Sequence, residues 1–190
     1  MDRTDILLVL LHYSPIVGNT RLQKLPFLIE QEKKILPDDG SFNYEANKFG
    51  PASRNLYDDI EFLINTGFVE KTGDINNLIH GKIEDIENMK ATDFLTNETI
   101  ITPVTDENED EDLQNKDPIN DDTKDDIVYR LTKKGKEYID LKGLLKDPIS
   151  NQIRDVSNKH TNKSLLQLLQ HVYTKFPDFT TESEIRDNIL

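Results

Sequence analysis

Hydrophobic positions recur at helical spacing over most of this chain, and they predict a mainly α-helical fold. Residues 4–13 are apolar on all sides, which is typical of a buried central helix. Residues 20–34 and 51–66 each carry one apolar stripe, so we expect two amphipathic helices there. The second of these has both ends marked. Pro51 suits a first helical position, and Gly67 suits a left-handed C-terminal cap.

Shorter runs of alternating residues predict a small antiparallel sheet of two or three strands. Residues 42–45 form the expected first strand, and residues 68–71 are expected to pair with residues 127–131 in a hairpin. The stretch 72–126 separates the two strands of this hairpin. A hairpin tip tolerates such an insertion, because the cost of loop closure grows only slowly with loop length.

The chain after residue 131 is predicted to be helical. Thr132 suits the cap of a helix that reaches about residue 145, and Asp147-Pro148 begins the next one. We therefore divide the chain into a domain, 1–145, which contains the insertion 72–126, and a C-terminal helical extension, 146–190. A later helix, capped by Asn162, has a stripe that either docks onto the domain or forms the seam of a homodimer: Leu165, Leu168, Leu169 and Val172, followed by Phe176.

Two stretches of the sequence resemble winged helix-turn-helix proteins. Gly50–Val69 and the later Tyr129–Gly135 are similar to the third helix, the wing and the fourth helix of PadR-type regulators. They resemble the YwgA-like regulators and the Panacea antitoxin domain more closely, where a segment like Arg21–Leu28 precedes an aromatic-Gly-Pro turn. The resemblance covers about residues 5–71 and 127–141. It implies an α+β winged helix with a small wing sheet, an insertion at the wing tip and dimerisation.

The net charge of −13 is concentrated in residues 76–126, which carry 16 acidic and 4 basic side chains. The remainder of the chain is nearly neutral, so the overall charge does not exclude nucleic acid as a partner. The most acidic part, residues 106–126, has three interpretations: a solvated linker, a phosphate mimic over the protein's own basic face, or a tail for a basic partner. Residues 83–89 fit a short helix and residues 99–102 a strand.

A DNA-binding transcriptional regulator is the first function that we expect. Arg54 and Asn55 lie in the first turn of the helix over residues 51–66, where a recognition helix contacts bases. Asp58 and Asp59 follow one turn later and would repel phosphates. The side chains expected at phosphates of double-stranded DNA are Arg21, Lys24, Lys48, Lys133 and Lys134.

A protein–protein interaction module, of the antitoxin-like or adaptor type, is the alternative. In this hypothesis the same helix and the acidic insertion contact a partner protein and not DNA. The charge over the helix distinguishes the two functions. A continuous positive surface favours DNA, and a surface interrupted by Asp58 and Asp59 favours a partner protein.

Catalysis, a metal site and a cofactor are not indicated by the sequence. It has no cysteine and no phosphate-binding loop, and an EF-hand-like run from Asp106 has Glu111 where glycine is required. The apolar run Ile6–Leu11 is too short for a signal core or a membrane span, so we expect a cytoplasmic protein that is not an enzyme. None of the histidines has the paired spacing of metal ligands: His12, His80, His160 and His171.

Overall fold

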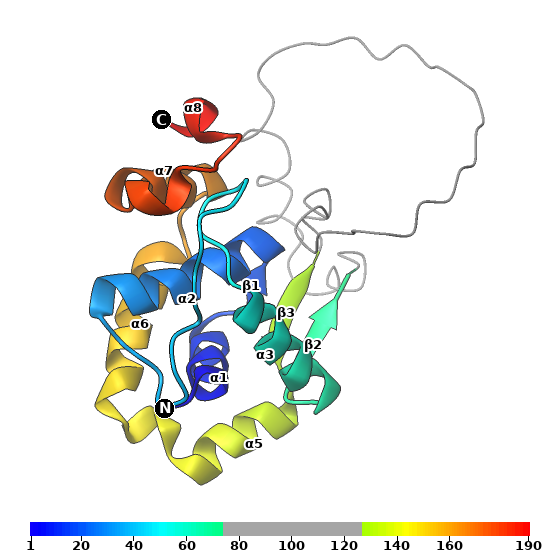
Figure 1. The fold of residues 1–190 in the computed structure, drawn as a ribbon. Coiled ribbons are helices and arrows are strands. Elements are labelled where there is room, and N and C mark those ends of the chain that lie inside the picture. The colour runs from blue at the N-terminus through cyan, green and yellow to red at the C-terminus, as the bar shows by residue number, and fades with distance from the viewer. Residues whose placement is uncertain (74–126) are drawn as a thin grey trace, which may run out of the picture.

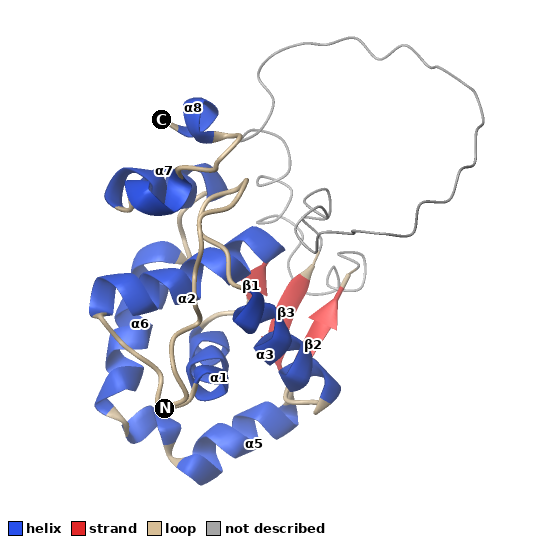
Figure 2. Ribbon diagram, in the orientation of Figure 1, coloured by secondary structure: helices blue, strands red, loops and turns tan. Residues whose placement is uncertain are grey.

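The computed structural model describes residues 1–73 and 127–190 (Figure 1). Helices form most of this part of the chain, and a small antiparallel sheet lies at one side (Figure 2). The mainly helical class with a small sheet is therefore confirmed. The helix predicted at residues 83–89, the strand at 99–102 and the acidic run at 106–126 lie outside the described residues.

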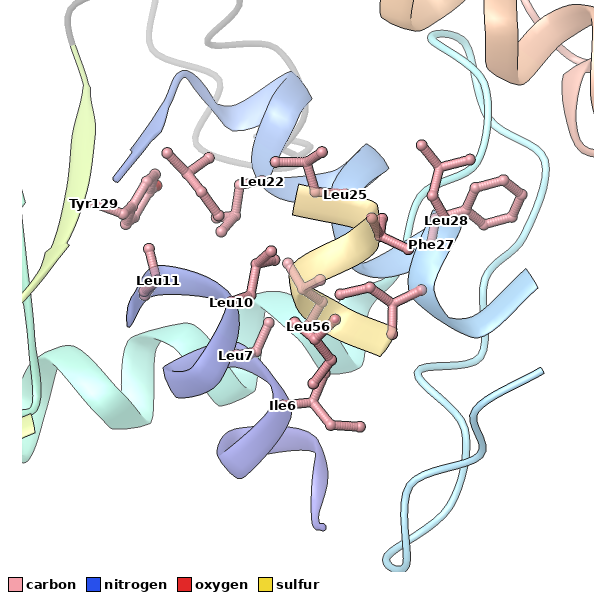
Figure 3. Packing of buried hydrophobic residues seen from close by; sticks show 14 of the residues in the cluster. Ile6, Leu7, Leu10, Leu11, Leu22, Leu25, Phe27, Leu28, Leu56 and Tyr129 are labelled. Atoms are coloured by element: carbon pink, nitrogen blue, oxygen red, sulfur yellow. The ribbon is translucent and has the colours of Figure 1, made fainter. Parts of the chain in front are cut away.

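Helix α1 (Arg3–Tyr13) is the centre of the core, as its uniformly apolar sequence predicts. The six residues from Ile6 to Leu11 are all buried, at 4% exposure or less. They contact α3, α5, α6 and strand β3, so every side of the helix faces another element (Figure 3). A helix surrounded in this way needs apolar side chains all round, and not only along one stripe.

Helix α2 (Asn19–Lys33) crosses the core beside α1 and continues through Pro26. Its middle section, from Leu22 to Ile29, is buried. Gly18 precedes it with a φ of 83°, a conformation that glycine adopts without steric cost. The helix ends at Lys34, which has left-handed geometry.

Helix α3 (Arg54–Asn65) begins later than predicted. Pro51 lies ahead of the helix, and Ser53 is the N-cap, whose hydroxyl oxygen accepts a hydrogen bond of 3.0 Å from the Leu56 amide. The predicted C-terminal end is confirmed, since Gly67 has a φ of 75°. The start of α3 was predicted wrongly because Ser53 can accept a hydrogen bond from a free amide group of the first turn. A proline at the first helical position cannot do this.

The sheet has three antiparallel strands in the order β1–β3–β2, formed by Ile16–Val17, Val128–Leu131 and Val69–Thr72. The predicted pairing of the second and third strands is confirmed, and it places Glu70 opposite Arg130. The first strand was predicted at residues 42–45, which is wrong. Ile16–Val17 holds that place, and Glu45 makes only an isolated bridge to Ala52.

Helix α5 (Lys133–Lys142) follows the sheet, and its predicted cap is confirmed because the Thr132 hydroxyl oxygen accepts from the Gly135 amide at 3.1 Å. A 3₁₀ turn, Leu144–Lys146, connects it to α6 (Pro148–His160), which the Asp147 carboxylate caps. Helix α5 ends earlier than residue 145, because Gly143 takes the left-handed conformation that closes a helix.

Helix α7 (Leu165–Lys175) packs on α2, and a 3₁₀ turn (Pro177–Thr180) and α8 (Arg186–Ile189) follow it. Ser164 caps α7 in place of the predicted Asn162. The structure decides between the two roles of its apolar stripe, since its central side chains are at most 1% exposed within this single chain. The stripe is a docking face. The homodimer seam predicted through it is wrong, because these residues are covered by their own chain: Leu168, Leu169 and Val172, with Leu165 half-buried.

Candidate functional site

The outward face of α3 is the surface on which both functional hypotheses depend. Its apolar stripe of Leu56, Ile60 and Leu63 is buried in the core. The opposite side carries exposed side chains at positions 54, 58, 61, 62 and 65, which fall on one face of a helix. We call this set the α3 face: Arg54, Asp58, Glu61, Phe62 and Asn65.

Charge on the α3 face is negative overall, with one arginine against two carboxylates. Asp59 does not belong to it, although the sequence suggested an exposed Asp58–Asp59 pair. One Asp59 carboxylate oxygen lies 2.7 Å from Nε of Arg3, and only 14% of the Asp59 side chain is exposed. Glu61 takes the place of Asp59 as the second exposed carboxylate.

Phe62 is the large apolar side chain of the α3 face, and 55% of it is exposed. It lies one turn after Asp58 on the helix, and Glu61 lies on the other side of Asp58 around the helix axis. Exposed aromatic rings are enriched at protein-contacting surfaces, whereas surfaces that face phosphates are rich in basic side chains.

The basic residues predicted to contact phosphates do not form one surface with the α3 face. Lys24 is 2% exposed, and its Nζ donates to the Pro51 carbonyl at 3.0 Å, so its role as a phosphate contact is wrong. Arg21 is half-buried and donates to the Lys163 carbonyl at 2.9 Å. Lys48 forms an ion pair with Glu184, with Nζ and Oε1 3.4 Å apart.

Lys133 and Lys134 lie at the other end of α3 from Arg54 and half-buried Asn55. Nζ of Lys134 donates to the Thr66 carbonyl at 2.7 Å, just beyond the end of α3, and lies 4.6 Å from the centre of the Phe68 ring. Lys133 is well exposed. A 12-residue helix is roughly 18 Å long, so the predicted base contacts and these two lysines are separated by about that length.

The segment 47–53, which leads into α3, is fixed by buried polar contacts to α2. Gln23 donates from Nε2 to the Ser53 carbonyl at 3.1 Å and accepts from the Ser53 amide at 2.9 Å. Lys24 holds Pro51 in the same way. These contacts join the segment Arg21–Leu28 to the turn that contains Gly50 and Pro51.

The C-terminal extension holds the other side of this segment. Gly50 has a φ of 79°, and a Cβ atom there would lie 2.8 Å from Cε2 of Tyr173. The Tyr173 hydroxyl group is 2.7 Å from Ser183 Oγ, which donates to the Lys48 carbonyl at 3.1 Å. The start of α3 is therefore positioned from two sides before any partner binds.

A second polar cluster, which the sequence did not reveal, joins α2, α6 and α7. His171 Nε2 is 2.6 Å from Glu32 Oε1, and His160 Nε2 is 3.5 Å from Glu32 Oε2. Lys159 and Lys175 also reach the Glu32 oxygens, at 3.0 and 2.9 Å. We call these five residues the Glu32 cluster.

Protonation in the Glu32 cluster follows from burial and charge. Burial alone raises the pKa of the Glu32 carboxyl, but hydrogen bonds from His171, Lys175 and Lys159 outweigh it and hold the pKa well below its usual range. Burial lowers the pKa of His160 to about 4, so this imidazole is neutral near pH 7. Glu32 is thus a carboxylate and His160 a neutral imidazole under physiological conditions.

The sequence carries no spacing signal for the Glu32 cluster. Glu32 is separated from His171 by 139 positions, and the two histidines come from different helices. Metal-ligand motifs are recognisable in a sequence when the ligands share a helix or a short loop. His171 lies beside the apolar stripe of α7, and this position does not distinguish a metal ligand from a structural histidine.

We found no family model, curated protein or solved structure that matches this chain. Within residues 1–73 and 127–190, no helix combines the length and the apolar character that crossing a bilayer requires.

Proposed function

We propose that this chain is a winged-helix protein-interaction module that docks a partner protein on the α3 face. The order of the elements supports the winged-helix assignment: helix α1, strand β1, helices α2 and α3, then the β2–β3 hairpin as the wing. Strand β1 joins the edge of the wing hairpin in the order β1–β3–β2. The third helix of such a fold is the one that reads its partner.

The composition of the α3 face is the observation that carries the proposal. Phe62 is 55% exposed and shares the face with Asp58 and Glu61, and Arg54 is the one positive group of the face. Lys24, which the sequence predicted to contact phosphates, is buried. A carboxylate pair in the middle of a recognition helix opposes the phosphate contacts that provide most of the affinity for DNA.

The partner's chemistry follows from the same face. A large exposed aromatic ring is a typical hot-spot residue and requires an apolar pocket on the partner. The two carboxylates of the same face require basic side chains on the partner beside that pocket, where they increase the association rate more than the affinity. This is the antitoxin-like or adaptor type of module.

Site-specific photo-crosslinking tests the proposal. A photoreactive phenylalanine analogue replaces Phe62 in the cells that produce the protein, and the same analogue at Leu141, which is 87% exposed on α5, is the matched control. We expect position 62 to yield a defined crosslinked protein and position 141 to yield none. Charge reversal at Asp58 and Glu61 should abolish that product, and equal products at both positions would refute the proposal.

A DNA-binding regulator is the second candidate, favoured by Arg54 and Asn55 at the start of α3 and by exposed Lys133. Binding to mixed-sequence duplex DNA should then weaken steeply with salt and fail in Arg54→Ala. The variant Asp58→Asn/Glu61→Gln makes a sharp comparison, because it removes two negative charges without adding a positive one. It should bind DNA more tightly if DNA is the partner, and should lose the crosslinked product if a basic protein is.

A further inference from the structure

Three side chains of the Glu32 cluster offer metal-ligand atoms within 4.8 Å of one another: one carboxylate oxygen of Glu32 and one ring nitrogen each of His160 and His171. They come from the last turn of α2, the end of α6 and the middle of α7. Since α6 and α7 both pack on α2, their side chains are brought to a common point beside Glu32. The cluster is independent of the α3 face.

His160 is the residue of the cluster that protein contacts leave unsatisfied. Its side chain is 0% exposed, and within the described residues neither ring nitrogen has a hydrogen-bond partner. Buried polar atoms are nearly always satisfied, so such a histidine needs an explanation. Its ring centre lies 4.7 Å from that of His171, which brings two imidazoles beside one carboxylate.

We propose that Glu32, His160 and His171 bind a divalent transition-metal ion, and that Zn²⁺ fits best. Two imidazole nitrogens and one carboxylate oxygen are a common three-ligand set for zinc, with a fourth position left for another ligand. Neutral imidazole suits Zn²⁺, whereas Mg²⁺ and Ca²⁺ require mostly oxygen ligands. The buried nitrogen of His160 gains a partner in this way.

Lys159 and Lys175 are the competitors for this site. Their ammonium groups contact the two Glu32 oxygens in the structure, and their side chains are 50% and 47% exposed. Long side chains with half of their surface in water can turn outward when a cation binds to Glu32. Their positive charge opposes the metal ion, so these two lysines set an upper limit on its affinity.

A bound ion has a structural consequence, because it connects α2 with α6 and α7. Helix α7 carries Tyr173, which contacts the segment 47–53 ahead of α3. Metal binding should therefore stabilise the C-terminal extension on the domain and raise the midpoint of thermal unfolding of the whole chain.

Calorimetric titration of the full-length protein with Zn²⁺ tests the proposal, and Mg²⁺ serves as the comparison ion. Co²⁺ provides a second readout, because the intensity of its visible absorption distinguishes four-coordinate binding from the six-coordinate ion in water. The two ligand variants are His171→Gln and His160→Gln. The first should fold, because the His171 side chain is partly exposed. The matched control is His12→Gln, because His12 is an exposed histidine on α1, outside the cluster.

We expect one Zn²⁺ per chain, unchanged in His12→Gln and weakened by more than about tenfold in His171→Gln and His160→Gln. Lys159→Gln/Lys175→Gln should bind Zn²⁺ more tightly than the original protein, because it removes the competing ammonium groups. A purely structural ion-pair cluster predicts the reverse, namely lower stability of the lysine variant and no gain in binding. Zinc binding that is absent, or that is the same in His171→Gln, would overturn the proposal.

Discussion

Replacing Gln23 by leucine tests whether the buried contacts between α2 and the segment 47–53 hold the start of α3 in place. Gln23 is 4% exposed and is bonded to both the amide and the carbonyl group of Ser53. Leucine has a similar size and fits the apolar surroundings, so the substitution removes two hydrogen bonds without leaving a large cavity. Ser53 also caps α3, so the loss is expected at the end of the helix that carries the α3 face.

The expected loss in the free energy of unfolding follows from the Ser53 amide and carbonyl groups, which lose their Gln23 partners. A buried backbone group that loses its partner costs about 1 to 3 kcal/mol, so Ser53 would lose about 2 to 6 kcal/mol. The greater hydrophobicity of a buried leucine returns about 2 kcal/mol of this. We expect a net destabilisation of up to about 4 kcal/mol, with about 2 kcal/mol as the middle of the range, set against the stability of about 5 to 15 kcal/mol that is usual for a domain.

Urea unfolding, followed by far-ultraviolet circular dichroism, measures this loss. Gln170→Leu is the matched control, because it makes the same chemical change at an exposed position of α7 and should alter the free energy of unfolding by less than about 0.5 kcal/mol. Amide hydrogen exchange at Ser53 should also accelerate in Gln23→Leu. The argument is refuted if Gln23→Leu unfolds at the same urea concentration as the original protein.

Three further predictions concern α5, the sheet and α7. Gly135→Ala should lower the urea midpoint although alanine favours helices, because its Cβ would lie 2.3 Å from the Phe68 carbonyl oxygen; an unchanged midpoint would contradict the packing. Burial raises the pKa of Tyr129 to about 12, above its unfolded value of about 10, so its stabilising effect is complete below pH 10 and is lost as the pH rises toward 12. Between pH 9 and 11 the original protein should lose about 1.4 kcal/mol that Tyr129→Phe does not lose, by urea unfolding at both pH values. Ser164→Ala should cost about 1 kcal/mol in the same assay by removing the α7 cap, and no loss would argue against that cap.

Local signals were sufficient to predict most of the helices. The apolar run of α1, the stripe and terminal glycine of α3 and the cap at Thr132 were all present in short windows of sequence. Each depends on residues within a few positions of one another, which is why periodicity and capping rules apply. The pairing of β2 with β3 across the long insertion was also predicted, because both strands alternate and a hairpin tip accepts added chain.

The errors occurred where a distant contact outweighs a local pattern. Residues 42–45 alternate like a strand, but Ile16–Val17 occupies the sheet edge that they would need. Lys24 looked like a surface lysine, but its side chain is buried and its ammonium group donates to the Pro51 carbonyl. An apolar stripe such as that of α7 has the same sequence whether it covers its own domain or a second copy.

The sequence by itself determined the helical class, the positions of most helices, the pairing of β2 with β3 and the concentration of negative charge in one insertion. Those properties come from the order of residues within one element or from counting side chains. Only the tertiary structure decided which charges remain on the α3 face, and only it brought Glu32, His160 and His171 together. The physical reason is that these arrangements depend on how separate helices pack, and no spacing along the chain records it.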